Sequence, residues 1–293
     1  MTNRRFSDFL RSHQRGIKTT FVCNGAVKVK SRKAISYREA FQALLSSFQE
    51  RMAWGGLNPD TQDYFYGSLE RWSMAIEELS RNPGRGPVLD LGAHEGFLCR
   101  ALVKLGYSVF ALDLHSPIDE SVWRRLGVEW RQCHIEADPI PFQDGYFTVI
   151  YMGQLLEHFT YSPRKPFQEI RRVLKPGGLF VVDVPNAGEW HNYYRLIRGK
   201  NILWDYKKHY IDYEPSFYKG RPYFERHNHE FTPNELRSLA EACQFEVERI
   251  AYIRSRRYGK KGVRRIEIPF TALRDLIPSF RKGIMLTARK NEL

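Results

Sequence analysis

The sequence predicts an α/β fold built around a mostly parallel sheet, and three observations indicate it. From residue 88 onward, short apolar runs of strand length alternate with segments of helical periodicity, the pattern of strand–helix–strand units. The run VLDLGAHEGF, residues 88–97, passes from a buried strand through two glycines into a helix that ends at Gly106. The second strand ends in an acid, Asp113. A nucleotide-like ligand typically binds where such a loop meets a helix N-terminus.

The expected elements follow one another in a regular order. Two amphipathic helices, with apolar faces over residues 41–52 and 64–79, precede a linker at 82–86. The expected strands are residues 88–91, 107–113, 128–135, 147–152, 179–185, 245–253 and 283–289. The expected helices between them are residues 97–105, 117–126, 155–174 with a break near 162–163, and a helix capped by Thr232. The last strand follows too closely for a crossover helix, so we expect it to pair antiparallel with the sixth.

Length and composition set the domain organisation. The 293 residues can bury one full core and carry additions. We expect residues 1–82 to form a helical N-terminal extension and residues 83–293 the main domain, with residues 187–228 as an insertion after the fifth strand. The 4 cysteines form no CxxC pair, so no zinc site, disulfide framework or other metal site is expected. No apolar stretch has the length of a membrane span, and a cytoplasmic location is expected.

The charge balance indicates an anionic partner. The formal net charge of +13 predicts attraction to nucleic acid, anionic lipid or a phosphate-bearing substrate. The basic residues concentrate in an N-terminal arm, residues 4–38, and in residues 254–265, which would suit a peripheral position at the inner face of a membrane. A basic surface without a partner has the same composition, so both interpretations stay open.

The glycine loop suits a nucleoside without phosphates better than a dinucleotide. A dinucleotide fingerprint requires GxGxxG, whereas here Gly92 and Gly96 are four residues apart and His94 lies between them. Asp113 follows the second strand, where a carboxylate can accept both hydroxyls of a ribose. Asp90, at the end of the first strand, can hold a cationic amine, and an acid in the loop would repel a pyrophosphate.

In their order and spacing these motifs resemble those of the class I S-adenosylmethionine-dependent methyltransferases. The resemblance is closest to the group with the ubiquinone-biosynthesis O-methyltransferases and the methyltransferases of surface-glycan gene clusters. It rests on VLDLGAHEG, ALDL, EADPIPFQDGYF, MGQLLEHF and EIRRVLKPGGLFVVDVPN, and more loosely on HEFTPNELRSLAEACQFEV. It implies a Rossmann-like seven-stranded methyltransferase sheet whose final strand is antiparallel.

The resemblance also implies a set of cofactor-binding residues for S-adenosylmethionine. These are Asp90, Gly92, Ala93, Gly96, Asp113, Leu114, Glu136, Ala137 and Gln154. Asp90 and the glycines would surround the methionine moiety, Asp113 would take the ribose hydroxyls, and Gln154 would lie near the transferred methyl. Glu136 would reach the adenine amino group and the Ala137 amide the ring. Two positions depart from the family: His94 replaces a common glycine, and Thr148 replaces an acid.

The candidates for a general base are histidines. The tetrapeptide that base-amino methyltransferases carry after strand four is absent, since Met152-Gly153-Gln154-Leu155 stands there, so a nucleobase amine is disfavoured and a hydroxyl acceptor stays open. His158 follows Gln154 by one helical turn and His229 precedes an acid, Glu230, so either imidazole would take a proton near pH 7. For His158 a role in helix packing is the alternative.

Several acceptors remain open at this point. The insertion, residues 187–228, is rich in aromatic and basic side chains that stack on sugars or bases and hold phosphate, and we expect it near the acceptor; a small cap packed on the core is the alternative. The first hypothesis is O-methylation of a glycan, a nucleotide-sugar or another small molecule, and a phenol is the second. RNA methylation, RNA binding without catalysis, and a non-catalytic partner subunit are further alternatives.

Overall fold

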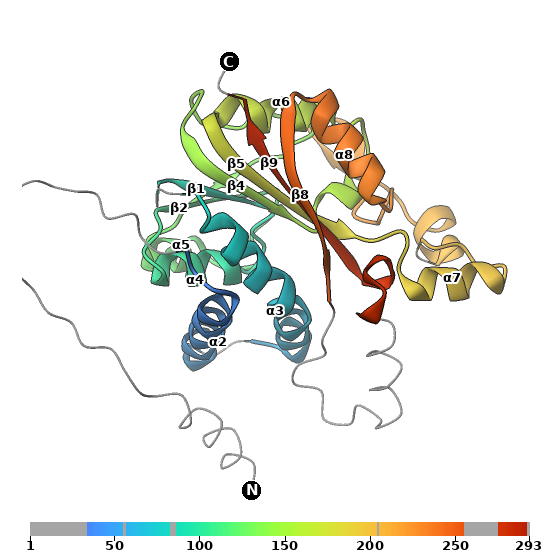
Figure 1. Ribbon diagram of the computed structural model, residues 1–293, viewed down its shortest axis with the longest axis horizontal. Coiled ribbons are helices and arrows are strands. Elements are labelled where there is room, and N and C mark those ends of the chain that lie inside the picture. Colours follow the sequence, from blue (N-terminus) through green and yellow to red (C-terminus); the bar gives the residue numbers. More distant parts are fainter. Residues whose placement is uncertain (1–33, 55–56, 83–85, 204, 255–274, 292–293) are drawn as a thin grey trace, which may run out of the picture. The chain divides into compact units, whose positions relative to one another are not determined.

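The computed structural model describes residues 34–54, 57–82, 86–203, 205–254 and 275–291, all of which belong to one compact unit spanning residues 32–293 (Figure 1). Within these ranges a seven-stranded sheet has the order β3-β2-β1-β4-β5-β9-β8. Its strands are β1 (Val88–Leu91), β2 (Val109–Asp113), β3 (Glu129–Gln132), β4 (Phe147–Gly153), β5 (Leu174–Pro185), β8 (Phe245–Ile253) and β9 (Gly283–Lys290). Neighbouring strands from β3 to β5 are parallel, and β9 is antiparallel to both β5 and β8. The predicted sheet with its antiparallel final strand is confirmed.

Helices cover both faces of the sheet (Figure 1). One face carries α2 (Tyr37–Ala53), α3 (Pro59–Leu79), α4 (Phe97–Lys104) and α5 (Glu120–Leu126), and the other carries α6 (Arg164–Val173) and α8 (Pro233–Ala242). Alternate strand residues point to opposite faces, so Val88 packs in the core under the first group and Leu89 in the core under the second. The central strands are therefore buried on both sides, as their apolar sequences predicted.

The two N-terminal helices pack into the same core as the sheet. The rings of Phe48 in α2 and Phe65 in α3 stack at 4.0 Å between centroids, and both are buried beside Phe97 of α4. Helix α3 begins at Pro59, earlier than the apolar pattern predicted, because the Asn58 side chain accepts the Thr61 amide at 2.7 Å and proline suits the first helical turn. Its first turn thereby reaches the carboxyl edge of the sheet.

Other boundaries differ from the predicted ones for local reasons. Helix α5 begins only after Asp119, whose side chain caps it, and β3 is confined to residues 129–132. The predicted helix 155–174 is a 3-10 turn, η1 (Leu156–His158), followed by α6, which begins after Pro163. Strand β5 begins before the predicted fifth strand and includes residues 174–178, where Gly177 adopts φ 69°.

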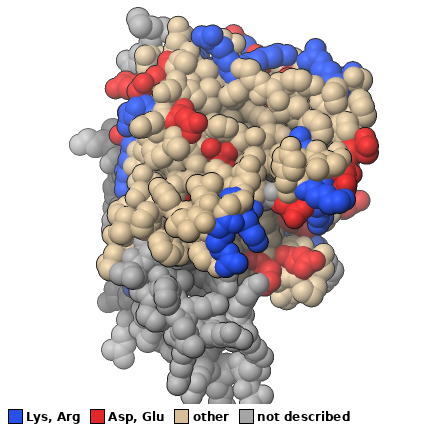
Figure 2. Space-filling view, turned by 90° about the vertical axis from the view of Figure 1, so that its right-hand side faces the viewer, with Lys and Arg blue, Asp and Glu red and all other residues tan. Residues whose placement is uncertain are grey.

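The insertion folds into short elements. They are α7 (Trp190–Ile197), the π-helical turn η2 (Lys207–Ile211) and a hairpin of β6 (Ser216–Tyr218) and β7 (Arg221–Tyr223). On the face shown in Figure 2, Lys and Arg form separate clusters with Asp and Glu between them and broad uncharged areas around them. On that face, the Lys and Arg residues thus do not form a single basic patch.

Parts of the charge predictions lie outside the described residues. These parts are residues 4–33 of the N-terminal arm and residues 255–265 of the second basic segment. No helix in the described ranges combines the length and the apolar character that crossing a membrane requires.

Candidate functional site

The loop between β1 and α4 is shaped by residues in the left-handed region. Gly92, His94 and Gly96 have φ of 78°, 46° and 67°. Glycine is required at position 96, since a Cβ there would lie 2.6 Å from the ring of buried Trp123. The Gly92 amide donates to the Leu112 carbonyl at 2.8 Å, which ties the loop to the end of β2.

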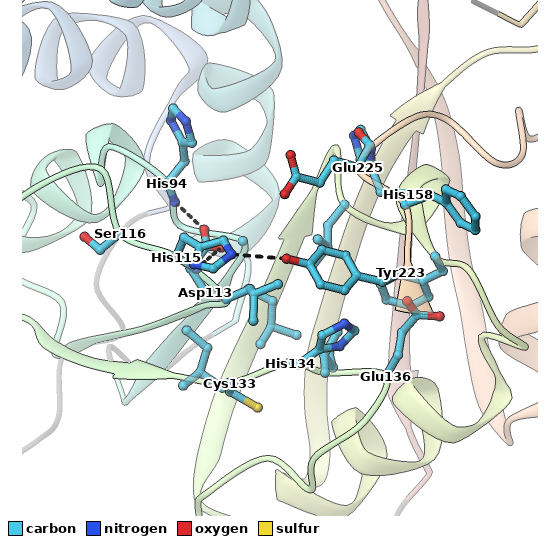
Figure 3. A pocket seen from close by; sticks show the side chains of 18 of the residues that line it. His94, Asp113, His115, Ser116, Cys133, His134, Glu136, His158, Tyr223 and Glu225 are labelled. Carbon is cyan, nitrogen blue, oxygen red and sulfur yellow. Dashed lines mark hydrogen bonds between the residues drawn. The ribbon is translucent and has the colours of Figure 1, made fainter. Parts of the chain in front are cut away.

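A first cavity opens at this carboxyl edge (Figure 3). Its volume is about 460 Å³, within the range of roughly 300–1,000 Å³ that small-molecule sites have. The walls come from the loops after β1, β2 and β3, from η1 and from the chain that follows β7. Leu112, Leu114 and Phe159 supply apolar surface, and Asp113 supplies a carboxylate at one end. This combination suits a flat apolar base joined to a diol.

Asp113 is held in place by backbone amides. Its Oδ2 accepts the His94 amide at 2.8 Å, and its Oδ1 lies 3.4 Å from the His115 amide nitrogen. Burial raises the pKa of Asp113, and these amide bonds oppose the rise. The glycine loop therefore orients the carboxylate toward the cavity, and the amide of His94, the residue that departs from the family pattern, makes one of the orienting bonds.

The insertion covers this cavity at the end of β2. Figure 3 shows Tyr223 of β7 reaching across it, with its hydroxyl 3.3 Å from His115 Nε2. Asp138 fixes the β6–β7 hairpin in place. It accepts the hydroxyl of Tyr218 at 2.5 Å and pairs with Lys219 Nζ at 2.7 Å. The sequence predicted the insertion near the acceptor, but its returning end lies in the same cavity wall as Asp113.

A second cavity of about 380 Å³ adjoins the first. The two share Gly92, His94, Asp113 and Leu155 in their linings. The second extends from Gln154 to the first turns of α3, where Asn58, Asp60, Thr61 and Tyr64 line it. Helix α3 thus borders the predicted cofactor site.

Seven of the nine predicted cofactor residues line a cavity or shape the loop. Gly92, Asp113, Leu114, Glu136 and Gln154 line one or both cavities. Ala93 and Gly96 shape the loop without lining either. Glu136 is engaged by its own chain, because its two carboxylate oxygens accept the Tyr161 amide at 2.7 Å and the Thr160 amide at 3.1 Å.

Two of the groups predicted to contact the cofactor already have hydrogen-bond partners within the chain. Asp90 is 3% exposed and lines neither cavity; its Oδ2 accepts the Cys99 thiol at 3.1 Å, and burial raises its pKa to about 7. It is therefore not placed to hold the cationic amine. The Ala137 amide donates to the His134 carbonyl at 2.8 Å, so the predicted amide bond to adenine would require that bond to be exchanged.

Replacing Asp90 with Asn should reveal the cost of burying this carboxyl. Because burial raises the pKa of Asp90 from 3.8 to about 7, the folded chain keeps a proton that the unfolded chain loses above pH 3.8. The stability that Asp90 provides in its protonated form is thus lost as pH rises toward 7. We expect the free energy of unfolding of Asp90→Asn, relative to wild type, to increase between pH 4 and pH 7 and then level off. Denaturant unfolding between pH 4 and pH 8 measures this difference in free energy, and Asp144→Asn, at an exposed carboxyl, is the control. A difference that does not change with pH would show that burial does not raise the pKa of Asp90.

The two candidate bases lie in different surroundings. His158 lines the first cavity, but burial, and then His227, lower its pKa to about 4, so it is neutral and only weakly basic at pH 7. His229 lines neither cavity, and its Nε2 lies 3.3 Å from Glu235 Oε1. Glu230 pairs with His227 instead, at 3.0 Å. The predicted His229–Glu230 pair is wrong, because the chain turns His229 toward the cap of α8.

Sequence reasoning missed the cavity residues that come from distant segments. Tyr64, Asn58 and Tyr223 each lie in regions assigned only to an extension or an insertion. A signal that could have found the α3 residues is Asn-Pro-Asp at 58–60, because an N-cap asparagine followed by proline in the first turn indicates a helix start.

The fold and the cavities are those of an α/β protein with a pocket at the carboxyl edge of its sheet that suits a nucleoside-like ligand. Residues 89–182 match the family model of the methyltransferase domain. Among curated proteins, the chain is 29% identical over 155 residues to a ubiquinone/menaquinone biosynthesis C-methyltransferase UbiE of Desulfotalea psychrophila, covering 50% of this chain and 56% of that protein. It is 32% identical over 118 residues to a demethylmenaquinone methyltransferase of Clavibacter sepedonicus, covering 40% and 48%. The chain spans about half the length of these relatives.

Solved structures agree on the fold. The complex between the Haloferax volcanii Trm112 methyltransferase activator and a methyltransferase superposes with a TM-score of 0.53 at 17% identity, covering 85% of this chain and 98% of that chain. A Listeria monocytogenes protein described as an S-adenosylmethionine-dependent methyltransferase gives 0.51 at 18% identity, covering 76% and 99%. The resemblance stated from the sequence is confirmed over residues 89–182, which match the methyltransferase domain, and the solved structures share the fold of the chain.

Proposed function

We propose that this chain transfers the methyl group of S-adenosylmethionine to a small-molecule acceptor. The observation that carries the proposal is the pair of adjoining cavities that meet at Gly92, His94 and Asp113. The first cavity suits the nucleoside half of the cofactor. The second continues past Gln154 to the surface at α3 and gives an acceptor a separate entrance.

The residues of the first cavity fit the cofactor by their chemistry. The Asp113 carboxylate accepts two ribose hydroxyls, and Leu112, Leu114 and Phe159 enclose a base. S-adenosylmethionine supplies an electrophilic methyl on a sulfonium, and its transfer is an in-line displacement in which positioning provides much of the rate. Gln154, beside the junction, is fixed by its Nε2 donating to Asp183 Oδ1 at 3.0 Å.

For the acceptor we favour a hydroxyl group. Asn58, Asp60 and Thr61 bring polar side chains to one end of the second cavity, which suits a hydroxylated molecule such as a glycan, a nucleotide-sugar or a phenol. A ring carbon is the second candidate, favoured by the names of the curated relatives, which include C-methyltransferases.

Turnover with methyl-labelled cofactor tests this function. The full chain is incubated with labelled S-adenosylmethionine and one acceptor class at a time: sugars and nucleotide-sugars, phenols, quinols, and RNA. We expect S-adenosylhomocysteine to form with a small-molecule class and the label to appear as an ether methyl; a ring-bound methyl would select the second candidate. Label in RNA would replace the small-molecule proposal. Cofactor binding without turnover on any class would favour a binding subunit, and absence of binding would refute the function.

A further inference from the structure

Side chains of the types that ligate metals form a compact group where η1 meets the chain that returns from the insertion. One carboxylate oxygen of Glu157, one imidazole nitrogen of His158 and one of His227 all lie within 4.8 Å of one another. Glu157 and His158 come from the exit of β4, and His227 follows the β6–β7 hairpin. The two segments are joined by their backbones, since the Glu157 carbonyl accepts the Asn228 amide at 2.7 Å.

The Glu157 carboxylate is the unexplained member of this group. The residue is 1% exposed, and neither of its carboxylate oxygens has a hydrogen-bond partner among the described residues. A buried carboxyl without a partner is costly, and native structures almost always satisfy such groups. The nearby cation Arg71 pairs with Asp183, at 3.7 Å. A further positive group beside Glu157 would remove the cost.

Both histidines are oriented as metal ligands usually are. His158 Nδ1 lies 2.9 Å from the Glu225 carbonyl oxygen, and His227 Nδ1 lies 3.0 Å from Glu230 Oε1. Because a carbonyl or carboxylate oxygen only accepts, each Nδ1 carries the proton and the lone pair is on Nε2. Imidazoles that bind metals characteristically donate their other N–H to a carbonyl or a carboxylate in this way.

We propose that Glu157, His158 and His227 bind a divalent transition-metal ion, with Zn²⁺ as the best match. Two imidazole nitrogens and one carboxylate oxygen are a recurrent zinc ligand set, and nitrogen ligands disfavour Mg²⁺ and Ca²⁺. The ion would lie beside the first cavity, which His158 lines, and would fasten the end of the insertion to η1. The site does not depend on the proposed methyl transfer. The sequence predicted no metal because its ligands come from separate segments and include no cysteine.

Zinc binding to the untagged full chain, freed of metal by a chelator, tests the site. Calorimetry with Zn²⁺ should give one site per chain, and Zn²⁺ should raise the unfolding temperature, whereas Mg²⁺ at the same concentration should do neither. Glu157→Gln keeps the size of the side chain but removes the anionic ligand, and His227→Ala removes a nitrogen. Each should weaken zinc binding at least ten-fold and abolish the rise in unfolding temperature.

His229→Ala is the matched control. His229 is a neighbouring histidine that pairs with Glu235 and stands outside the group, so its removal should leave zinc affinity unchanged. The proposal fails if wild type binds less than one zinc per chain, or if His229→Ala loses as much affinity as His227→Ala. Circular dichroism of each metal-free variant shows whether it folds, and Glu157→Gln alone decides the matter if His227→Ala does not. Because no readout uses S-adenosylmethionine, failure here leaves the methyltransferase proposal intact.

Discussion

Asp113→Ala is expected to weaken the binding of S-adenosylmethionine and S-adenosylhomocysteine at least ten-fold, a loss of about 1.4 kcal/mol or more. The carboxylate is the charged acceptor at the end of β2, and it also fixes the loop by accepting the His94 amide at 2.8 Å. Removing it therefore takes away the acceptor of the ribose hydroxyls and leaves the His94 amide without its partner. Isothermal calorimetry of both ligands with wild type and variant measures the effect.

Two further variants separate recognition from folding. Asp113→Asn keeps one oxygen for the His94 amide but accepts fewer ribose hydroxyls, so its affinity should fall between those of wild type and Asp113→Ala. Asp144→Ala removes a carboxylate that is 80% exposed, pairs with Arg172 and lines neither cavity. It should bind as wild type does. Equal affinities for wild type and Asp113→Ala would show that the first cavity does not hold the ribose.

The sheet was predictable because its signals are local. Each buried strand is a short apolar run, and the close spacing before the last strand excluded a crossover helix, so β9 was correctly expected to be antiparallel. Element boundaries were less predictable, since they depend on single caps. Asn58 begins α3 five residues before its apolar face, and Asp119 delays α5, and neither effect is visible in hydrophobic periodicity.

The candidate site was predictable where a single sequence motif fixes both the place of a residue in the fold and its chemical type. Gly92 and Asp113 lie at the carboxyl ends of adjacent parallel strands, which fold topology alone brings together. Pairings between a segment and the helix that follows it were not predictable: the thiol of Cys99 in α4 donates to Asp90 in β1, and Glu235 in α8 pairs with His229 just before it. In both cases a polar side chain with an apparent functional role has a partner that only the tertiary structure supplies.

Arg71→Met is expected to cost about 3–5 kcal/mol of unfolding free energy, the loss typical of a buried ion pair deprived of one partner. Arg71, in the middle of α3, is 8% exposed and lies 3.7 Å from Asp183 Oδ1, and Asp183 is fully buried in β5. The same guanidinium donates to the hydroxyls of Tyr151 and Tyr64, at 3.2 and 3.1 Å. Asp183 also accepts Gln154 Nε2, so the pair links the N-terminal helix to the junction of the two cavities.

The double variant Arg71→Met with Asp183→Asn distinguishes a lost contact from a stranded charge. If the cost arises because Asp183 is left charged and buried, neutralising it should recover much of the stability that Arg71→Met loses. Arg124→Met is the matched control, because it breaks an i,i+4 ion pair with Glu120 at the surface, where the two side chains are 76% and 72% exposed. Such a pair contributes about 0.3–0.5 kcal/mol to the free energy of unfolding. Denaturant unfolding measures all three. A double variant no more stable than Arg71→Met would assign the loss to the contact of the guanidinium with the Trp72 ring, 4.8 Å from its centroid, rather than to the ion pair.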